Sequence, residues 1–384
     1  MVSSQAVMQN QFTEDFKKFL QHDVGSLRSL REEAFAIFSD KGFPTVKSED
    51  WKYTNVAAIA KENWTVGVPE TLGKVPEGDF LKLLRDFYFD RNGFTALNMA
   101  FAEPFVFRIP KETNLEKPIE FSFATDEGAA SFPHVLIIAE AGSKATIVEA
   151  YLGKDRSFTN AAVQIVVEDN ANLTHYRVQR ESAEAFHVGT TEVTLRRGSF
   201  YNATNINLGG AISRHDINVK FTAEGGECFV DGLYMVGGSQ HADTHSVIDH
   251  AVPNCISHQT YKGVLNDKSR AVFNGKVFVR EDAHGTDAQQ SNKNLLLSND
   301  ARVDTKPQLE IFNDDVKCSH GATVGQLEEE ELFYLLTRGL PETLARNLLT
   351  YGFAEQIINK IEIESIKKEL DEAVLNRLNA NLEA

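Results

Sequence analysis

The sequence predicts a mainly β protein in which a parallel β-solenoid is flanked by helical regions. Three observations carry this prediction. Apolar residues alternate with other residues along the central part of the chain, which is typical of strands. Strand-like segments recur at a nearly fixed step. Apolar residues near both termini recur at spacings of three and four, which is typical of amphipathic helices. We therefore expect a helical region over 1–93, a β-solenoid over 94–322 and a helical region over 323–384.

The first region begins with two amphipathic segments. One carries Phe12, Phe16 and Phe19, and the other carries Leu27, Leu30, Ala34, Ile37 and Phe38. Residues 41–44 read Lys-Gly-Phe-Pro and should end the second helix. Glycine accepts the left-handed conformation of a helix C-terminus, and proline cannot continue the helical hydrogen bonds.

The apolar period changes to two from about Phe94. It continues through Phe105, Phe107 and Ile109, and then through Ile119, Phe121 and Phe123. Phe107, Phe121 and Val135 are separated by equal steps of 14 positions, and a buried strand is expected over 135–138. Four similar segments then end at Ile165, Val193, Val219 and Val247, which gives steps of 28, 26 and 28.

Turn signals recur with the same period. They are Ala141-Gly142, Asn170-Ala171, Arg197-Gly198 and Gly225-Gly226. A parallel solenoid explains both series, because each coil buries its inner face only against neighbouring coils and must turn at regular intervals. We expect the register to break between Pro253 and Lys268. A β-sandwich of hairpins is the alternative, since its strands also recur at short intervals.

The last region should contain three helices. Leu332, Leu335 and Leu336 form the apolar stripe of the first, and Pro341 suits the start of the second. The second carries Leu344, Leu348, Leu349, Phe353 and Ile357, and the third is expected over 364–382. Glu328 to Glu331 stand in the first turn, where carboxylates face the positive end of the helix dipole. As a default, we expect most of these leucines to be core residues.

Charge and composition exclude several classes of protein. With 39 basic and 55 acidic residues, the formal charge is −16, which disfavours nucleic acid and acidic membranes as partners. The N-terminus lacks the features of a secretory signal, and no apolar window reaches the roughly 18 residues of a membrane span. The three cysteines, Cys228, Cys255 and Cys318, fit reduced thiols in a cytoplasmic protein.

Nucleotide-binding and hydrolase motifs are missing from the sequence. It contains no phosphate-binding P-loop, no strand-linked G-x-G-x-x-G and no G-x-S-x-G elbow, so we expect no ATP hydrolysis by this chain.

A histidine-rich stretch is a candidate metal site. His215, His241, His245, His250 and His258 fall within 44 residues, together with Asp243, Asp249 and Cys255. His241, Asp243 and His245 alternate, so on a strand all three project from one face and could hold zinc or iron. The alternative is a ladder of hydrogen-bonded polar residues along one face of the solenoid.

Cys318 and His320 form a second candidate. In an extended segment the thiolate and the imidazole point the same way, which suits iron or zinc. Two ligands cannot complete a tetrahedral site, so a site shared with another chain is the sharper hypothesis. A buried strand end and a Cys–His nucleophile pair are the alternatives.

Several segments resemble the SufB/SufD family of iron–sulfur cluster assembly proteins. The most specific is DDVKCSHGATVGQLEEEELFYLLTRGL at 314–340. NLLLSNDARVDTKPQLEIF at 294–312, PNCISHQTYKGVL at 253–265, AVFNGKVFV at 271–279 and FTALNMAF at 94–101 are also similar to that family. The resemblance covers roughly residues 25–355. SEDWKYTNV at 48–56 and the length of 384 residues resemble the shorter branch of the family and not the longer SufB branch.

The resemblance implies a right-handed parallel β-helix without enzyme activity of its own. It implies pairing with SufB through the end of the β-helix and binding of the SufC ATPase through the C-terminal helices. We place that ATPase contact at Leu332, Phe333, Leu336, Leu348 and Leu349. The complex would build a transient iron–sulfur cluster, shared with SufB, and deliver it to apo-proteins. His320 matches the histidine implicated in cluster formation at the paired interface, and Cys318 is the neighbouring motif cysteine. A reduced flavin is a candidate cofactor of the complex.

Two other classes remain open. An exported β-solenoid acting on carbohydrates would need paired carboxylates or a calcium site. A metal-binding β-solenoid would use the histidines between His215 and His258 and would carry metal as an isolated chain.

Overall fold

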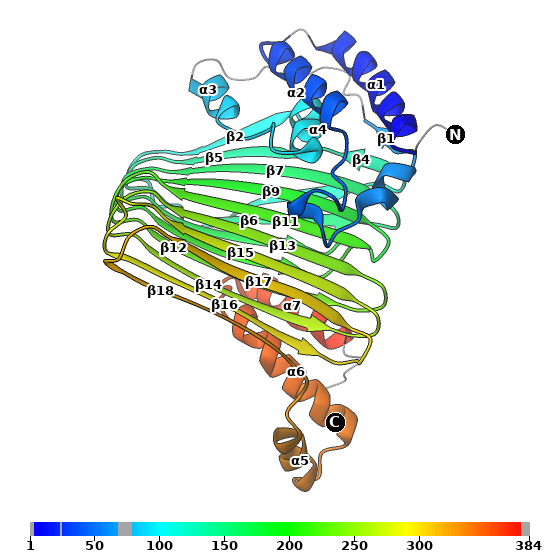
Figure 1. The fold of residues 1–384 in the computed structure, drawn as a ribbon, viewed down its shortest axis with the longest axis vertical. Helices are drawn as coiled ribbons and strands as arrows, with labels where there is room; N and C mark the ends of the chain where they lie inside the picture. Colours follow the sequence, from blue (N-terminus) through cyan, green and yellow to red (C-terminus); the bar gives the residue numbers. More distant parts are fainter. Residues whose placement is uncertain (1–3, 24, 68–78, 378–384) are drawn as a thin grey trace.

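A computed structural model describes residues 4–23, 25–67 and 79–377 of the chain, and its centre is a solenoid of parallel strands (Figure 1). The strands form two sheets, one of ten strands and one of eight, and from β5 on successive strands alternate between them. Every strand pair in the two sheets is parallel, which excludes the sandwich of hairpins. The predicted β-solenoid is therefore confirmed.

The ten-stranded sheet, called sheet A here, begins with short strands and continues with long ones. It consists of β1 (Thr65–Val66), β2 (Pro104–Ile109), β4 (Ala129–Ser131), β5 (His134–Ala139), β7 (Phe158–Val167), β9 (Phe186–Leu195), β11 (Ile212–Phe221), β13 (His241–His250), β15 (Arg270–Val279) and β17 (Arg302–Ile311).

The eight-stranded sheet, sheet B, lies opposite sheet A across the interior of the solenoid. It consists of β3 (Ile119–Thr125), β6 (Lys144–Gly153), β8 (Asn172–Gln179), β10 (Phe200–Asn207), β12 (Glu227–Val236), β14 (Ile256–Leu265), β16 (Thr286–Leu296) and β18 (Val316–Gly325).

The register confirms two of the three predicted steps. Val193 pairs with both Ile165 and Val219, as expected. Val219 pairs with Ile248 and not with Val247, because this coil is one residue longer. The step of 14 positions is half a coil, since Phe107 belongs to sheet A and Phe121 to sheet B.

Two expectations for the strands are wrong. The predicted break between Pro253 and Lys268 does not occur, because β14 pairs in register with β12 and β16. The strand period expected from Phe94 begins only at Pro104, because residues 93–101 form a helix.

The predicted turns form one corner of the solenoid. Gly142, Asn170, Gly198 and Gly225 all have positive φ, as do Asn254 and Gly285 further along. The N–H of each of Gly142, Asn170 and Gly198 donates to a carbonyl of the next coil. A Cβ at Gly198 would lie 2.6 Å from the side-chain oxygen of Asn170, so the close stacking of coils requires glycine there.

N-terminal helices cover the outer face of sheet A near the first coils (Figure 1). They are α1 (Ser4–His22), α2 (Arg28–Lys41), α3 (Asp79–Arg85) and α4 (Gly93–Phe101). The two amphipathic helices expected at the start are confirmed, and Gly42, with φ 61°, ends α2. Two short 3₁₀ helices, Glu49–Trp51 and Val56–Lys61, connect this region to the sheet.

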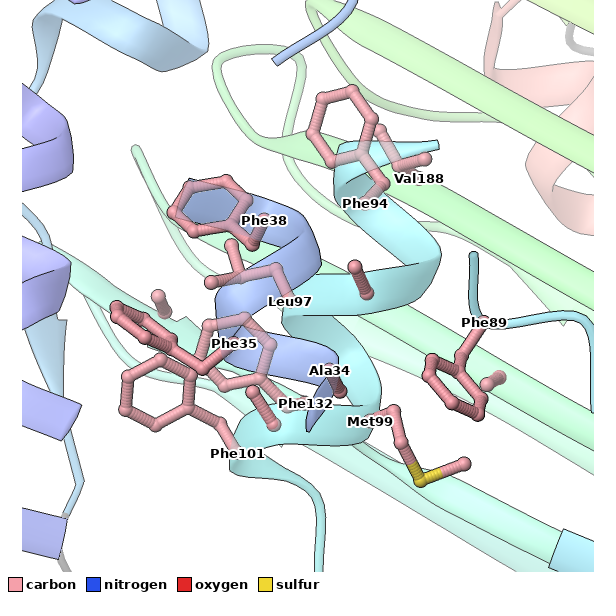
Figure 2. Close-up of a cluster of buried hydrophobic side chains, with 14 of the residues drawn as sticks. Ala34, Phe35, Phe38, Phe89, Phe94, Leu97, Met99, Phe101, Phe132 and Val188 are labelled. Atoms are coloured by element: carbon pink, nitrogen blue, oxygen red, sulfur yellow. The ribbon is translucent and has the colours of Figure 1, made fainter. Parts of the chain in front are cut away.

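Helix α4 is the centre of this covering layer, and all nine of its residues are buried. Figure 2 shows α4 packed against α2, with Phe94, Leu97 and Phe101 among the apolar side chains of the cluster. On the side of sheet A, the Asn98 amide donates to the carbonyls of Pro133 and Asn160. An apolar helix in this position has no polar face, because it is enclosed on all sides.

Three helices follow the solenoid, as predicted: α5 (Glu329–Thr337), α6 (Glu342–Ile358) and α7 (Glu364–Arg377). The end of the third helix expected up to residue 382 lies outside the described residues. Ala354, Ile357 and Ile358 of α6 pack with Val374 of α7 on the outer face of sheet B. Helix α5 has no buried residue and lies away from the sheets at the C-terminal end of the solenoid (Figure 1).

The interior between the sheets has an apolar part and a polar part. The apolar part fills one side with residues such as Ile137, Ile165 and Phe221. In the polar part, His175 contacts the carboxylate of Glu149 at 2.8 Å, and both side chains are fully buried. A polar column of sheet B continues through Gln259, Gln290 and His320, which are successive partners in the register. The polar part of the interior therefore reaches the C-terminal end.

Candidate functional site

The C-terminal end of the solenoid is open. β17 and β18 are the last strands of their sheets, and each pairs on one side only among the described residues. The outward backbone groups of such edge strands can accept another strand. We call this end, formed by 302–325, the open end.

Both residues of the predicted Cys–His pair lie on β18 at the open end. Cys318 pairs with Ala288 and His320 with Gln290, and both of these partners are buried. Parallel partners share a face of the sheet, so Cys318 and His320 occupy positions of the interior face in the last coil. The structure therefore brings the two residues to one face, as the spacing predicts.

The two side chains differ in environment. Cys318 is half-buried and packs with Val277, Ala288 and Leu309. Burial raises the pKa of the Cys318 thiol, and the nearby Asp287 carboxylate adds to this. Binding of iron or zinc would therefore have to displace the thiol proton. His320 is exposed.

The donor set is incomplete within one chain. Across the parts of the chain that the structure describes, no three histidine, cysteine, aspartate or glutamate side chains are placed to hold a metal ion together. Cys318 and His320 supply two donors where a tetrahedral site needs four.

A polar floor lies beneath His320 and the two following interior positions of β18, Ala322 and Val324. It consists of Gln290, Asn292 and Asn294 of β16, and all three are buried. Asn294 donates to the Asn292 amide oxygen at 2.7 Å, and Thr305 of β17 donates to the same oxygen at 2.8 Å. This floor is not among the features predicted from the sequence. The alternation of amides at 290, 292 and 294 is the signal that could have found it.

The histidine-rich stretch does not form one site. His215 and His250 point into the interior, where they contact Thr191 and Ser257. His258 lies on the outer face of sheet B and contacts Asp287 at 3.3 Å. Burial lowers the pKa of His250 to about 4.

His241, Asp243 and His245 do share the outer face of β13, as their alternation predicts. Asp243 accepts hydrogen bonds from Thr54 and Arg214 at 2.5 and 2.8 Å, and His245 contacts it at 3.0 Å. Its oxygens are therefore engaged with protein groups. The structure favours the hydrogen-bonded ladder at these three residues.

Large apolar side chains are exposed at and beyond the open end. Ile311, Phe312 and Val324 stand on or beside the last strands. On the helices, Phe333 is 67% exposed, and Tyr334, Leu336 and Leu348 are also exposed. Leu332 and Leu349 are half-buried. The expectation that most of these leucines belong to the core is therefore wrong: Leu336 and Leu348 are exposed, and the others, Leu332, Leu335, Leu344 and Leu349, are only half-buried.

Comparison with known proteins agrees with this arrangement. Residues 122–353 match the SufBD core domain of the SUF system for FeS cluster assembly, and residues 2–80 match the N-terminal region of SufBD proteins. A SufBD family protein of Synechocystis is 38% identical over 336 residues, which are 84% of this chain and 71% of the relative.

Two similar proteins are named SufD. The iron–sulfur cluster assembly protein SufD of Escherichia coli is 37% identical over 251 residues, 65% of this chain and 59% of that protein. SufD of Bacillus subtilis is 31% identical over 302 residues, 73% of this chain and 66% of that protein.

Proposed function

Because this chain belongs to the SufB/SufD family of iron–sulfur cluster assembly proteins, we propose that it is a scaffold subunit that acts through its open end. In this proposal it pairs with a SufB-type chain, binds a SufC-type ATPase and hydrolyses no ATP itself. The assembled complex builds a cluster and hands it to apo-proteins in the cytoplasm.

The observation that carries the proposal is an incomplete set of metal-binding side chains on the unpaired edge strand β18. Cys318 and His320 stand on β18, whose outer edge is free among the described strands. A second chain that docks on this edge would bring its own donors to the same place. A cluster held by donors from two chains can be released when the chains move apart, which suits a carrier of a transient cluster. Iron and sulfide are here the cargo.

A different surface would bind the ATPase. Helix α5 buries none of its residues, and its apolar stripe includes Phe333 and Leu336. Exposed large apolar residues that cluster on one element are typical of protein-binding surfaces. The nearby Leu348 of α6 extends the same surface. We assign this surface to the SufC-type partner.

Within the described residues, no helix is long and apolar enough to cross a membrane. A reduced flavin remains a proposed cofactor of the assembled complex, and we assign no residue to it.

Co-expression tests the proposal directly. This chain would be purified with the SufB-type and SufC-type proteins of its own source, and native mass spectrometry would weigh the complex. We expect one SufB-type chain, two SufC-type chains and one copy of this chain. A monomer that ignores both partners would contradict the proposal, and metal bound to that monomer would favour the metal-binding alternative.

A further inference from the structure

A cavity of about 620 Å³ lies between the N-terminal region and the outer face of sheet A, far along the chain from Cys318 and His320. One wall consists of outward residues of β11, β13 and β15, including Asn218, His245 and Lys276. The other wall consists of residues 41–51 and 91–93. Its volume lies in the range of small-molecule sites, which often form where two parts of a protein meet.

The acidic groups of the cavity are already engaged or lie at its rim. Both oxygens of Asp216 accept hydrogen bonds from Arg214. Glu49 is 74% exposed and pairs with Lys306. The Asp50 side chain is exposed, and its backbone carbonyl accepts from Arg214.

Three basic side chains of the lining are not fully neutralised by carboxylates and can bind a negatively charged ligand. Lys41 donates to the backbone carbonyl of Asp90 and forms no ion pair among the described residues. Lys276 is 3.6 Å from Glu310, which is a loose pair. Arg91 contacts Glu192 through one guanidinium nitrogen only, so its other N–H groups are not used in this ion pair. The lining therefore favours an anion.

His245 adds a directed polar group. Its Nε2 is 3.0 Å from Asp243 Oδ1, and because an ionised carboxylate can only accept, this contact favours the tautomer with the proton on Nε2. Burial acts to raise the pKa of Asp243, but the charge of Arg214 and the hydrogen bonds from His245 and Thr54 lower it well below its usual range. In the neutral ring the lone pair is then on Nδ1, which has no partner in the described part of the chain.

We propose that this cavity binds a small molecule with a phosphate group and an apolar body. A phosphate suits several cations at once, since it carries up to two charges and three acceptor oxygens. A monoprotonated phosphate can also donate its hydrogen to His245 Nδ1. Val247, Phe278 and Pro44 supply apolar lining for the body.

Phenyl phosphate is a suitable probe of the full chain, with isothermal titration calorimetry and phosphorus NMR as measurements. We expect saturable binding of phenyl phosphate, weaker binding of inorganic phosphate and none of phenol. Lys276→Met and Arg91→Met should each weaken binding about tenfold, because each removes one charged hydrogen bond.

Lys220→Met is the matched control, since Lys220 is an exposed lysine on the same face of β11 outside the cavity. Its affinity should equal that of the unchanged protein. The proposal is overturned if millimolar phenyl phosphate gives neither heat nor a change in the phosphorus spectrum. It is equally overturned if all three variants bind alike.

Discussion

The two ends of the solenoid differ in the length of their edge strands and in what covers them. At the first coils the edge strands β1, β2 and β3 have two, six and seven residues, and prolines stand at 104, 110 and 118. A layer of helices covers the adjoining face of sheet A. At the open end β17 and β18 have ten residues each, with exposed apolar residues beside them, and β17 contains Pro307 while β18 contains no proline. Short strands and prolines are means of blocking an edge, so the first end is protected, whereas the long, proline-free β18 leaves the other end available.

From this difference we infer that residues at the covered first coils serve stability and that exposed residues at the open end serve binding. If it is right, equal changes at the two ends have unequal effects on the free energy of unfolding. The following predictions test this, beginning with the largest expected effect on the isolated chain.

Phe101→Ala should be the most damaging change. Phe101 is 4% exposed, and its ring contacts five other phenylalanines. We expect a loss of about 3–5 kcal/mol, because a large buried ring leaves a cavity. Urea unfolding measures it. Phe333→Ala is the control at the other end and should change stability by less than about 0.5 kcal/mol. Equal losses in the two variants would break the comparison.

Arg214→Met should cost nearly as much. Arg214 is 2% exposed, lies 3.8 Å above the Trp51 ring, and pairs with Asp216 and Asp243. Its loss leaves two buried carboxylates without a cation, which costs about 3–5 kcal/mol. Arg270, paired with Asp304, is 45% exposed on the same face of sheet A. Arg270→Met should cost less than about 1 kcal/mol, as exposed pairs do.

The buried ion pair of Arg214 and Asp243 predicts that the free energy of unfolding decreases at acidic pH. The folded pKa of Asp243 lies below the unfolded value of about 3.9. The unfolded chain therefore binds more protons as the pH falls below about 4, and stability decreases. In Asp243→Asn this part of the decrease should disappear. Urea unfolding at several pH values between about 5 and 3 compares the two proteins, and parallel curves would refute the assignment.

Phe333→Asp with Leu336→Asp should abolish ATPase binding while leaving the isolated chain as stable as before. Both side chains are exposed on α5, so the carboxylates remain in water in the free chain but would be buried in a complex. Pull-down with the SufC-type protein measures the loss. Lys368→Asp on α7, an exposed helix position away from α5, is the control that should still bind. Retained binding by the double variant would place the ATPase elsewhere.

His320→Ala should have the smallest effect on folding and a specific effect on function. The side chain is exposed, so we expect an unchanged fold and normal pairing with the SufB-type chain. Delivery of clusters in cells should fall. Ser319→Ala, one position away on the other face of β18, should deliver clusters normally. Normal delivery by His320→Ala would remove this residue from the site.

Periodic features of the sequence predicted most of the solenoid. Steps near 28 residues and glycine-containing turns follow from stacking, because every coil repeats the same geometry. The failures are local. FTALNMAF at 94–101 is mostly apolar, and a short apolar run does not distinguish a strand from a buried helix. The coil before β13 is one residue longer, which shifts the partner of Val219 by one.

The candidate site was predicted only in part, because alternation along one strand is visible in the sequence but contacts between strands are not. The alternation of Cys318 and His320 placed both on one face, and the structure agrees. The polar floor could not be located, since it depends on which strand lies beneath β18. The histidines from 215 to 258 looked like one cluster along the chain, but their division between interior and outer faces needs the register of two sheets.

The blocked first coil has a consequence for assembly size. In the language of polymer chemistry, the chain resembles a monomer with a single reactive group. Two such monomers join once, and the product has no reactive end left. A solenoid open at both ends would add subunits without limit and form fibres, because head-to-tail contacts do not close. Prolines at 104, 110 and 118 and the short strands beside them would thus act as a chain terminator, which limits association along the solenoid axis to a pair.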